Sequence, residues 1–481
     1  MLEYRIPEEH HIKIVQDPAK LFTISIGLLG DLAAAINRDE ITPDLLSKMK
    51  SNLAFSARFF DSYLQSKLNE TLDPYLLLLG SASYYLCDSP GSALVLASKM
   101  NDHVGNLRIN ELYCPDLEGE GLEFLLLWLL QSDLSNYFSD TNSKFGRHID
   151  HISYSVCRLF LTGESATLEN EISQLREHAY SFGTPRQLLL CDAICAIIKK
   201  KIINSAWLCL PHYSDLPKSL WSSAIKKRSF IKELWPAQHL LGKASVLRGK
   251  SAIIQMPTSA GKTKSIEIIL RSAFLADRTS LAIIIAPFRA LCSEIKNSLS
   301  EAFHDELIKV NELSDALQTD FDIAELLGHQ QILVVTPEKL AYVLRHAPEL
   351  TTKVGLLIFD EGHQFDSGTR GITYELLLTS LRSMIPEGAQ KVLISAVISN
   401  AEAVGEWLNG EPNVVKGTKL IPTFRSVGFV SWLDQLGRIE YVDSRDTEQN
   451  EFFVPRVIER FNLGRRGKEQ NDRHFPEKDD G

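Results

Sequence analysis

The sequence has few cysteines, no long uninterrupted apolar run and no excess of positive charge. Its seven cysteines include no Cys-x-x-Cys pair, which argues against a disulfide framework and a zinc ribbon. The longest apolar stretch, Leu122 to Leu130, is interrupted by Glu123 and is shorter than the ~20 residues that a membrane span needs. The N-terminus lacks the basic-then-apolar pattern of a secretory signal. We therefore expect a soluble cytoplasmic protein of a reducing compartment, with no membrane partner.

The net charge of −10 also excludes one class of protein. A protein that coats polyanions non-specifically would be strongly basic. A motor that grips nucleic acid through a narrow channel is still compatible with this charge, because whole-chain charge is a weak guide to local potential. The 481 residues and the 44% hydrophobic content indicate about three globular domains.

Residues 1–215 are predicted to form an all-helical domain. Apolar residues recur at three- and four-residue spacing between residues 45 and 68, as on one face of a helix. Further on, residues 75–87 and 92–100 are separated by Asp-Ser-Pro-Gly, a break typical of a helical hairpin. We expect this domain to be a platform that docks a partner protein.

Residues 216–427 have the pattern of an α/β domain. Short apolar runs alternate with helical stretches, and the strongest runs are residues 252–254, 281–286, 332–336, 356–359 and 391–395. Such strands are typical of a parallel sheet with both faces covered. The predicted fold is therefore α + α/β, with an all-helical domain followed by one doubly wound parallel-sheet domain.

Residues 428–481 are predicted to be a linker and the beginning of a further domain. A β-like stretch from Gly428 to Val442 precedes an expected helix from Phe452 to Phe461. The segment Gly464–Gly481 is highly charged and almost free of apolar residues, a composition typical of disorder.

The strongest motif is a phosphate-binding loop at residues 256–263, Met-Pro-Thr-Ser-Ala-Gly-Lys-Thr. Small residues let backbone N–H groups converge on phosphate oxygens, and the helix that follows adds the positive end of its dipole. Lys262 would neutralise the β- and γ-phosphates, and the Thr263 hydroxyl would bind Mg²⁺. Met256 replaces the usual first glycine. The predicted ATP-binding residues of this loop are Pro257, Thr258, Ser259, Ala260, Gly261, Lys262 and Thr263.

A second motif, Asp360-Glu361-Gly362-His363, follows the apolar run 356–359. The Asp360 carboxylate, at the end of a buried strand, can reach the Mg²⁺ on Thr263, and Glu361 can orient or deprotonate the attacking water. Alone, the motif could be a turn with solvated acids. Combined with the phosphate loop it predicts an ATPase with ATP and Mg²⁺ as cofactors and Lys262, Asp360 and Glu361 as catalytic residues.

Together the two motifs resemble superfamily 2 helicases of the DExH type, and their Ski2-like branch most of all. The resemblance covers residues 230–427 and implies a RecA-like lobe of the P-loop NTPase class. Gln238, within Leu-Trp-Pro-Ala-Gln, stands where the family carries its adenine-sensing glutamine. Trp235 could stack on the base or pack in the core.

Further segments match family motifs that contact nucleic acid or couple it to ATP. Residues 286–291 and 336–340 resemble the motifs that grip one strand, which implies contacts from Arg289 and Thr336. Asp-Ser-Gly-Thr-Arg-Gly at 366–371 resembles the extension after the DExH motif in Ski2-like enzymes, and implies a contact from Arg370.

The coupling motif also departs from the usual pattern. Ser395-Ala396-Val397 resembles a motif that is commonly Ser-Ala-Thr, so Ser395 and His363 would relay nucleotide state to strand movement. Val397 removes one hydroxyl from that motif.

The family's motors have two RecA-like lobes with ATP between them, and the second lobe supplies an arginine to the transferred phosphoryl group. None of the later arginines lies in such a motif, so we expect the motor to need a second lobe, in cis or in trans. The run 256–275, the segment 286–295 and the helical first half resemble the helicase subunits of Hachiman-type antiphage defence systems. This implies a nuclease-like partner protein on the helical domain.

Two functions from different classes follow. One is an ATP- and Mg²⁺-dependent helicase or translocase that acts on single-stranded or tailed nucleic acid, with DNA favoured, in DNA processing or antiphage defence. The alternative is an ATP-binding interaction module that docks a partner without catalysis, which the lack of a second lobe favours.

Overall fold

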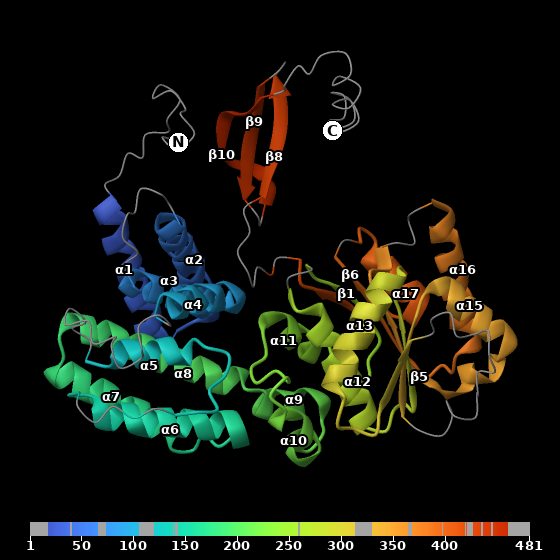
Figure 1. The fold of residues 1–481 in the computed structure, drawn as a ribbon, viewed down its shortest axis with the longest axis horizontal. Helices are drawn as coiled ribbons and strands as arrows, with labels where there is room; N and C mark the ends of the chain where they lie inside the picture. The colour runs from blue at the N-terminus through green and yellow to red at the C-terminus, as the bar shows by residue number, and fades with distance from the viewer. Residues whose placement is uncertain are drawn as a thin grey trace.

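The computed structural model describes residues 18–38, 41–65, 74–104, 120–137, 139, 143–257, 260–312, 330–363, 368–396, 398–418, 420, 427–433, 436–443 and 446–459. These residues form a helical platform, a parallel α/β domain and a small antiparallel sheet (Figure 1). The predicted fold class, helical first and doubly wound second, is confirmed.

The platform consists of helices wrapped around one buried helix. Its described helices are α1 (Pro18–Arg38), α2 (Pro43–Gln65), α3 (Pro74–Leu86), α4 (Pro90–Val104), α5 (Leu122–Leu129), α6 (Gly146–Thr162), α7 (Leu168–Phe182) and α8 (Pro185–Asn204). Proline begins several of them, because its missing N–H would have no partner in the first turn. Residues 193–198 of α8 are fully buried, and α8 contacts α1, α3, α5 and α7. The predicted helical hairpin is confirmed as α3 and α4.

One described helix, Lys20–Arg38 within α1, is long and apolar enough to cross a membrane, with a mean hydropathy of 1.3 in its most apolar window. Its residues Leu29, Leu32 and Ala33 are fully buried in the platform core. A core helix passes the same test of length and composition, so we interpret α1 as part of this core.

The α/β domain is built on one parallel sheet. Its strands are β1 (Ala252–Gln255), β2 (Leu281–Ile285), β3 (Lys309–Glu312), β4 (Gln331–Val335), β5 (Val354–Phe359), β6 (Gln390–Ser395) and β7 (Val414–Lys416), in the order β3-β4-β2-β5-β6-β1-β7. The five predicted strands are confirmed, and β3 and β7 are additional edge strands.

Helices cover both faces of this sheet. They are α11 (Pro236–Lys243), α12 (Lys262–Leu275) and α13 (Arg289–Ala302) on one side, and α15 (Pro337–His346), α16 (Gly368–Met384) and α17 (Ala401–Asn409) on the other. Successive strand residues point to opposite faces: Ile254 and Ile284 join one core, whereas Ile253 and Ile283 join the other.

A short segment joins the platform to the α/β domain. Ile198 packs in the platform core, whereas Ala206 packs in a core of the α/β domain. The helices α9 (Ala206–Ser214) and α10 (Lys218–Lys226) follow. The Leu234 amide donates to the Asn204 carbonyl at 2.8 Å. Glu233 accepts a hydrogen bond from Tyr85 on α3 and lies 3.0 Å from Lys201 Nζ on α8. Two platform helices are therefore held to the segment that leads into α11.

We expect Glu233→Ala to destabilise this junction. The side chains of Lys201 and Glu233 are only 11% and 20% exposed, so the substitution leaves a mostly buried ammonium and the Tyr85 hydroxyl without their shared partner. A cost of about 2 kcal/mol is expected, which lowers the melting temperature by roughly 4–8 °C. Arg158→Ala is the control, because the Arg158–Glu164 pair is about half exposed and such pairs contribute little. Equal melting temperatures for the two variants would contradict this role of Glu233.

A three-stranded antiparallel sheet follows the α/β domain. It consists of β8 (Val427–Leu433), β9 (Leu436–Asp443) and β10 (Asp446–Glu459), in the order β10-β9-β8. The helix predicted from Phe452 to Phe461 is wrong, because the segment up to Glu459 pairs with β9 as a strand. Its aromatic and β-branched residues fit a strand as well as a helix. The predicted tail Gly464–Gly481 lies outside the described residues.

Candidate nucleotide-binding site

The two chemical motifs meet at one edge of the parallel sheet. The phosphate loop follows β1, Asp360 follows β5, and Ser395 ends β6, which lies between them. Parallel strands place their carboxyl ends at the same edge, where open α/β sheets bind ligands. Backbone hydrogen bonds fix this edge: the Met256 amide donates to the Ser395 carbonyl at 3.0 Å, and the Asp360 amide to the Ile285 carbonyl at 2.9 Å.

The phosphate loop turns directly into α12. Gly261 precedes the helix with a φ of +82°, a left-handed conformation that glycine adopts without strain. Met256 and Ala260 are fully buried, so the residue that replaces the usual glycine packs in the core. Thr263 is exposed in the first turn of α12, and Pro257 accepts a hydrogen bond from the Ala260 amide at 3.0 Å. Thr258 and Ser259 lie outside the described residues.

Lys262 and Glu361, 99 residues apart in sequence, form an ion pair at this edge. Lys262 Nζ lies 2.9 Å from Glu361 Oε1, and the two side chains are 9% and 22% exposed. Glu361 has a φ of +50°, which is uncommon for a residue other than glycine, asparagine or aspartate and is typical of functional sites. The adjacent Gly362 is required sterically, because a Cβ there would lie 2.4 Å from Leu393 Cδ2.

Asp360 is a buried carboxyl group next to a second acid. Its pKa is raised to about 6, chiefly by burial and then by the charge of Glu361, while the charge of Lys262 opposes both effects. Its Oδ1 accepts a hydrogen bond from the Glu361 amide at 3.0 Å. A cation near Asp360 would stabilise its ionised form.

The donor set fits Mg²⁺. The Asp360 carboxylate and the Thr263 hydroxyl are the hard oxygen ligands that Mg²⁺ prefers. Across the part of the chain that the structure describes, no group of three or more His, Cys, Asp or Glu residues could hold a metal ion. Mg²⁺ needs no such group, because it usually binds one or two carboxylates together with phosphates and water.

His363 connects the motif to β6. Its Nδ1 lies 3.2 Å from Ser395 Oγ and 3.4 Å from Glu361 Oε2. Ser395 is fully buried, so its hydroxyl is fixed relative to the sheet. The two residues predicted to relay nucleotide state are therefore in contact, and His363 also touches Glu361. Val397 lies outside the described residues.

Gln238 lies next to the phosphate loop, as the sequence predicts. It is 4% exposed, its Oε1 accepts a hydrogen bond from the Trp235 amide at 2.9 Å, and its Nε2 donates to Ser265 Oγ at 3.4 Å. A Cβ on Gly261 would lie 3.1 Å from the same Nε2. The amide therefore links the start of α11 to the start of α12.

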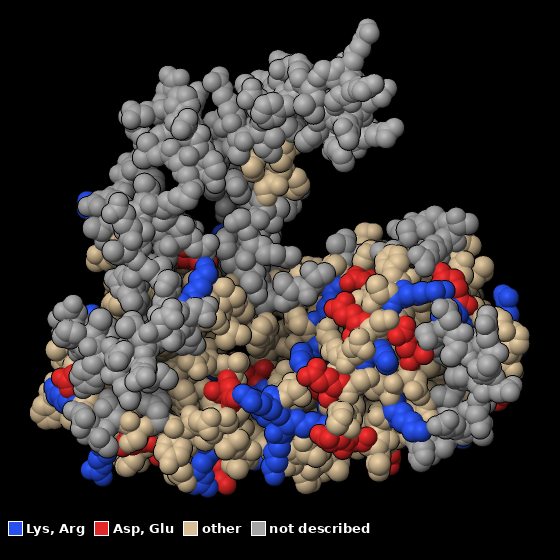
Figure 2. All heavy atoms as spheres, in the orientation of Figure 1, with Lys and Arg blue, Asp and Glu red and all other residues tan. Residues whose placement is uncertain are grey.

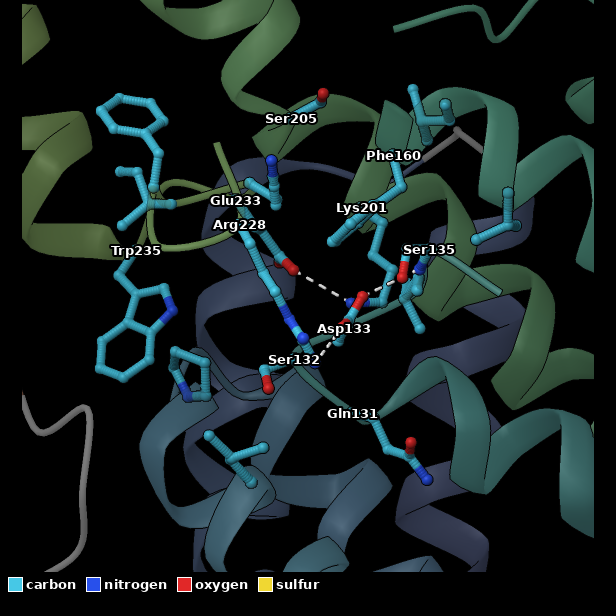
Figure 3. A pocket seen from close by; sticks show the side chains of 18 of the residues that line it. Gln131, Ser132, Asp133, Ser135, Phe160, Lys201, Ser205, Arg228, Glu233 and Trp235 are labelled. Atoms are coloured by element: carbon cyan, nitrogen blue, oxygen red, sulfur yellow. Dashed lines mark hydrogen bonds and ion pairs between the residues drawn. The ribbon is translucent and has the colours of Figure 1, made fainter. Parts of the chain in front are cut away.

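A cavity of about 660 Å³ extends from this point to the platform. Trp235, Gln238 and Gly261 line it on one side, and Gln131–Ser135 of the platform on the other. Figure 3 shows two ion pairs in this cavity, Arg228 with Asp133 and Lys201 with Glu233. Arg228 Nη2 lies 3.3 Å from Asp133 Oδ2. Trp235 is half-buried in this wall. The platform's contribution to this wall was not predicted, because no sequence motif marks it.

The predicted nucleic-acid contacts begin two helices at the same sheet edge. Arg289 is exposed at the start of α13 after β2, and Thr336 is the N-cap of α15 after β4. The side chain of Arg370 lies outside the described residues. Figure 2 shows acidic and basic side chains interspersed over the α/β domain on the face in view, so strand contacts there would come from individual loop residues.

Comparison with known proteins agrees with this geometry. Residues 237–404 match the family model "DEAD/DEAH box helicase". The matched residues include Gln238, Lys262, Asp360 and Ser395. The predicted resemblance to Ski2-like DExH helicases is confirmed.

Similarity to known proteins reaches beyond residues 237–404. The chain is 24% identical to Hachiman protein HamB of Bacillus cereus over 426 residues, which cover 86% of this chain and 38% of HamB. It is 30% identical to the ATP-dependent DNA helicase Hel308 of Thermococcus kodakarensis over 241 residues, or 50% of this chain and 20% of Hel308. The chain thus spans well under half the length of these relatives. The helicase MrfA is a structural neighbour with a TM-score of 0.33 and 22% identity, over 41% of this chain and 32% of that one.

We expect Gln238→Glu to weaken the preference for ATP over GTP. The glutamate keeps the oxygen that accepts from the Trp235 amide, but it loses the N–H that faces the phosphate loop and adds a negative charge. Loss of one hydrogen bond to the base corresponds to about a tenfold weaker ATP affinity. Competition of ATP and GTP for a fluorescent ATP analogue measures this preference. An unchanged ATP-to-GTP ratio would contradict base recognition by Gln238.

Proposed function

We propose that this chain contains the ATP-binding lobe and a helical platform of an ATP- and Mg²⁺-dependent nucleic-acid helicase or translocase. The observation that carries the proposal is the convergence of Lys262, Asp360 and Glu361 at one sheet edge, within the helicase domain. Arg289 and Thr336 at the same edge support strand binding, with DNA favoured because Hel308 is named a DNA helicase.

The proposed hydrolysis of ATP starts from the Lys262–Glu361 ion pair. On ATP binding, Lys262 exchanges the Glu361 carboxylate for β- and γ-phosphate oxygens. Glu361 is then free to orient a water molecule and accept its proton, while His363 holds its other oxygen. The water oxygen forms a bond to the γ-phosphorus, and the bond from that phosphorus to the β-bridging oxygen breaks. Mg²⁺, held by Thr263 and Asp360, would supply positive charge at the phosphates.

A second RecA-like lobe is part of the proposal. The described residues contain one parallel sheet, and the arginine that stabilises the transferred phosphoryl group in such motors comes from the second lobe. Further polypeptide or a separate chain would supply it. His363 and Ser395 would report the state of the nucleotide to that lobe.

The platform would bind a partner protein. The match to HamB covers most of this chain, including residues outside the helicase domain. This supports a role in a Hachiman-type system. As part of the proposal, that role is antiphage defence in the cytoplasm, with a nuclease-like partner on the platform.

The test is steady-state ATP hydrolysis with and without single-stranded DNA or RNA, on this chain alone and together with a second RecA-like lobe. We expect ATP binding with hydrolysis near background for the chain alone, and hydrolysis stimulated by nucleic acid when both lobes are present. ATP binding without hydrolysis in the two-lobe form would favour the alternative, an ATP-binding interaction module. Rapid DNA-stimulated hydrolysis by the chain alone would refute the need for a second lobe.

A further inference from the structure

Tyr374 on α16 is a buried tyrosine whose hydroxyl has no hydrogen-bond partner among the described residues. The residue is 3% exposed. Leaving a buried polar group unpaired costs about 1–3 kcal/mol, so such groups are rare and need an explanation.

Two other tyrosines in the chain show how buried hydroxyls are satisfied here. Tyr84 and Tyr85 are 2% and 5% exposed. Tyr84 donates to Asp61 at 3.2 Å, and Tyr85 donates to Glu233. Each of these two buried hydroxyls therefore has a carboxylate as its acceptor, whereas that of Tyr374 has none among the described residues.

Asp360 directly follows the residue against which the Tyr374 ring packs. The Tyr374 ring packs edge-on against Phe359, the residue before Asp360, with ring centroids 6.4 Å apart and an interplanar angle of 87°. Burial raises the pKa of Tyr374, and the charge of Asp360 raises it further. Tyr374 and Asp360 are both buried, and the ring contact places Tyr374 beside the strand end that carries Asp360; the Tyr374 hydroxyl makes no hydrogen bond to that carboxyl group in this structure.

We propose that Tyr374 is a positioning residue for Asp360, whose carboxylate accepts a hydrogen bond from the Tyr374 hydroxyl when Mg²⁺ and ATP are bound. This rests on the proposed function of the site. An ionised carboxylate has about four acceptor positions, and metal-binding carboxylates are commonly oriented by such second partners. Among the described residues, Asp360 receives one side-chain hydrogen bond, from the Glu361 amide to Oδ1, and the Tyr374 hydroxyl would add another donor.

The test is Tyr374→Phe, which removes only the hydroxyl. Binding of a fluorescent ATP analogue is measured as a function of Mg²⁺ concentration. We expect the Mg²⁺ concentration for half-maximal binding to rise about tenfold, the effect of losing one hydrogen bond to a charged group. Binding measured in EDTA stays unchanged. Tyr342→Phe is the matched control, because Tyr342 on α15 is 47% exposed and lies outside the proposed machinery.

Thermal unfolding in EDTA separates positioning from a structural role. Removing an unpaired buried hydroxyl should leave the melting temperature unchanged or raise it. An unchanged Mg²⁺ requirement in Tyr374→Phe would overturn the inference, and so would a lower melting temperature with binding weakened equally with and without Mg²⁺. If the wild-type chain binds no nucleotide, the proposed function itself fails.

Discussion

Replacing Lys262 with Ala is expected to abolish Mg·ATP binding, with a loss of at least about 100-fold in affinity. Lys262 is nearly buried, and its ammonium is held at the sheet edge where the phosphates would lie. Charge-assisted hydrogen bonds contribute about 1.5–3 kcal/mol each, so loss of contacts to two phosphates accounts for this effect. Titration with a fluorescent ATP analogue measures it.

Lys353→Ala is the control for the Lys262 experiment. Lys353 is an exposed lysine that precedes β5, at the opposite edge of the sheet from Asp360. Its removal should leave ATP affinity unchanged. Wild-type affinity in Lys262→Ala would show that the phosphates bind elsewhere.

Glu361→Gln is expected to preserve ATP binding and to slow hydrolysis. The amide cannot accept the proton from the attacking water, and general-base catalysis contributes about 10²–10⁴-fold to rate. The substitution also removes the charge that pairs with Lys262, so ATP affinity should stay the same or increase. Single-turnover hydrolysis in the two-lobe form measures the rate.

The matched control for this variant is Glu349→Gln, an exposed acid in the 3₁₀ segment Pro348–Lys353. It should hydrolyse ATP at the wild-type rate. Hydrolysis by Glu361→Gln at that same rate would remove Glu361 from its proposed role.

The fold was predictable where hydrophobicity alone determines structure. β1, β2, β4, β5 and β6 lie inside the sheet, are almost fully buried, and each contains at least three consecutive apolar residues. The edge strands β3 and β7 were missed. β3, Lys-Val-Asn-Glu, alternates between exposed and half-buried residues, and pairing with a single neighbour demands no apolar run. The part of β10 from Phe452 onwards was mistaken for a helix, because only its pairing with β9 distinguishes the two.

The candidate site was predictable where its chemistry lies in contiguous residues. The phosphate loop and Asp360-Glu361-Gly362-His363 are local patterns, and the sheet brings them together as expected. Contacts that depend on tertiary structure were not predictable. The Lys262–Glu361 ion pair and the platform wall of the cavity join segments that are distant in sequence, and the packing of Tyr374 against Phe359 joins a helix to a strand.

The central claim is that the convergence of Lys262, Asp360 and Glu361 forms a Mg·ATP site. Equilibrium titration of the purified 481-residue chain with ATP tests it most directly, in Mg²⁺ and then in EDTA. The account predicts one saturable site per chain in Mg²⁺ and markedly weaker binding in EDTA. The absence of saturable binding in Mg²⁺ would contradict the account.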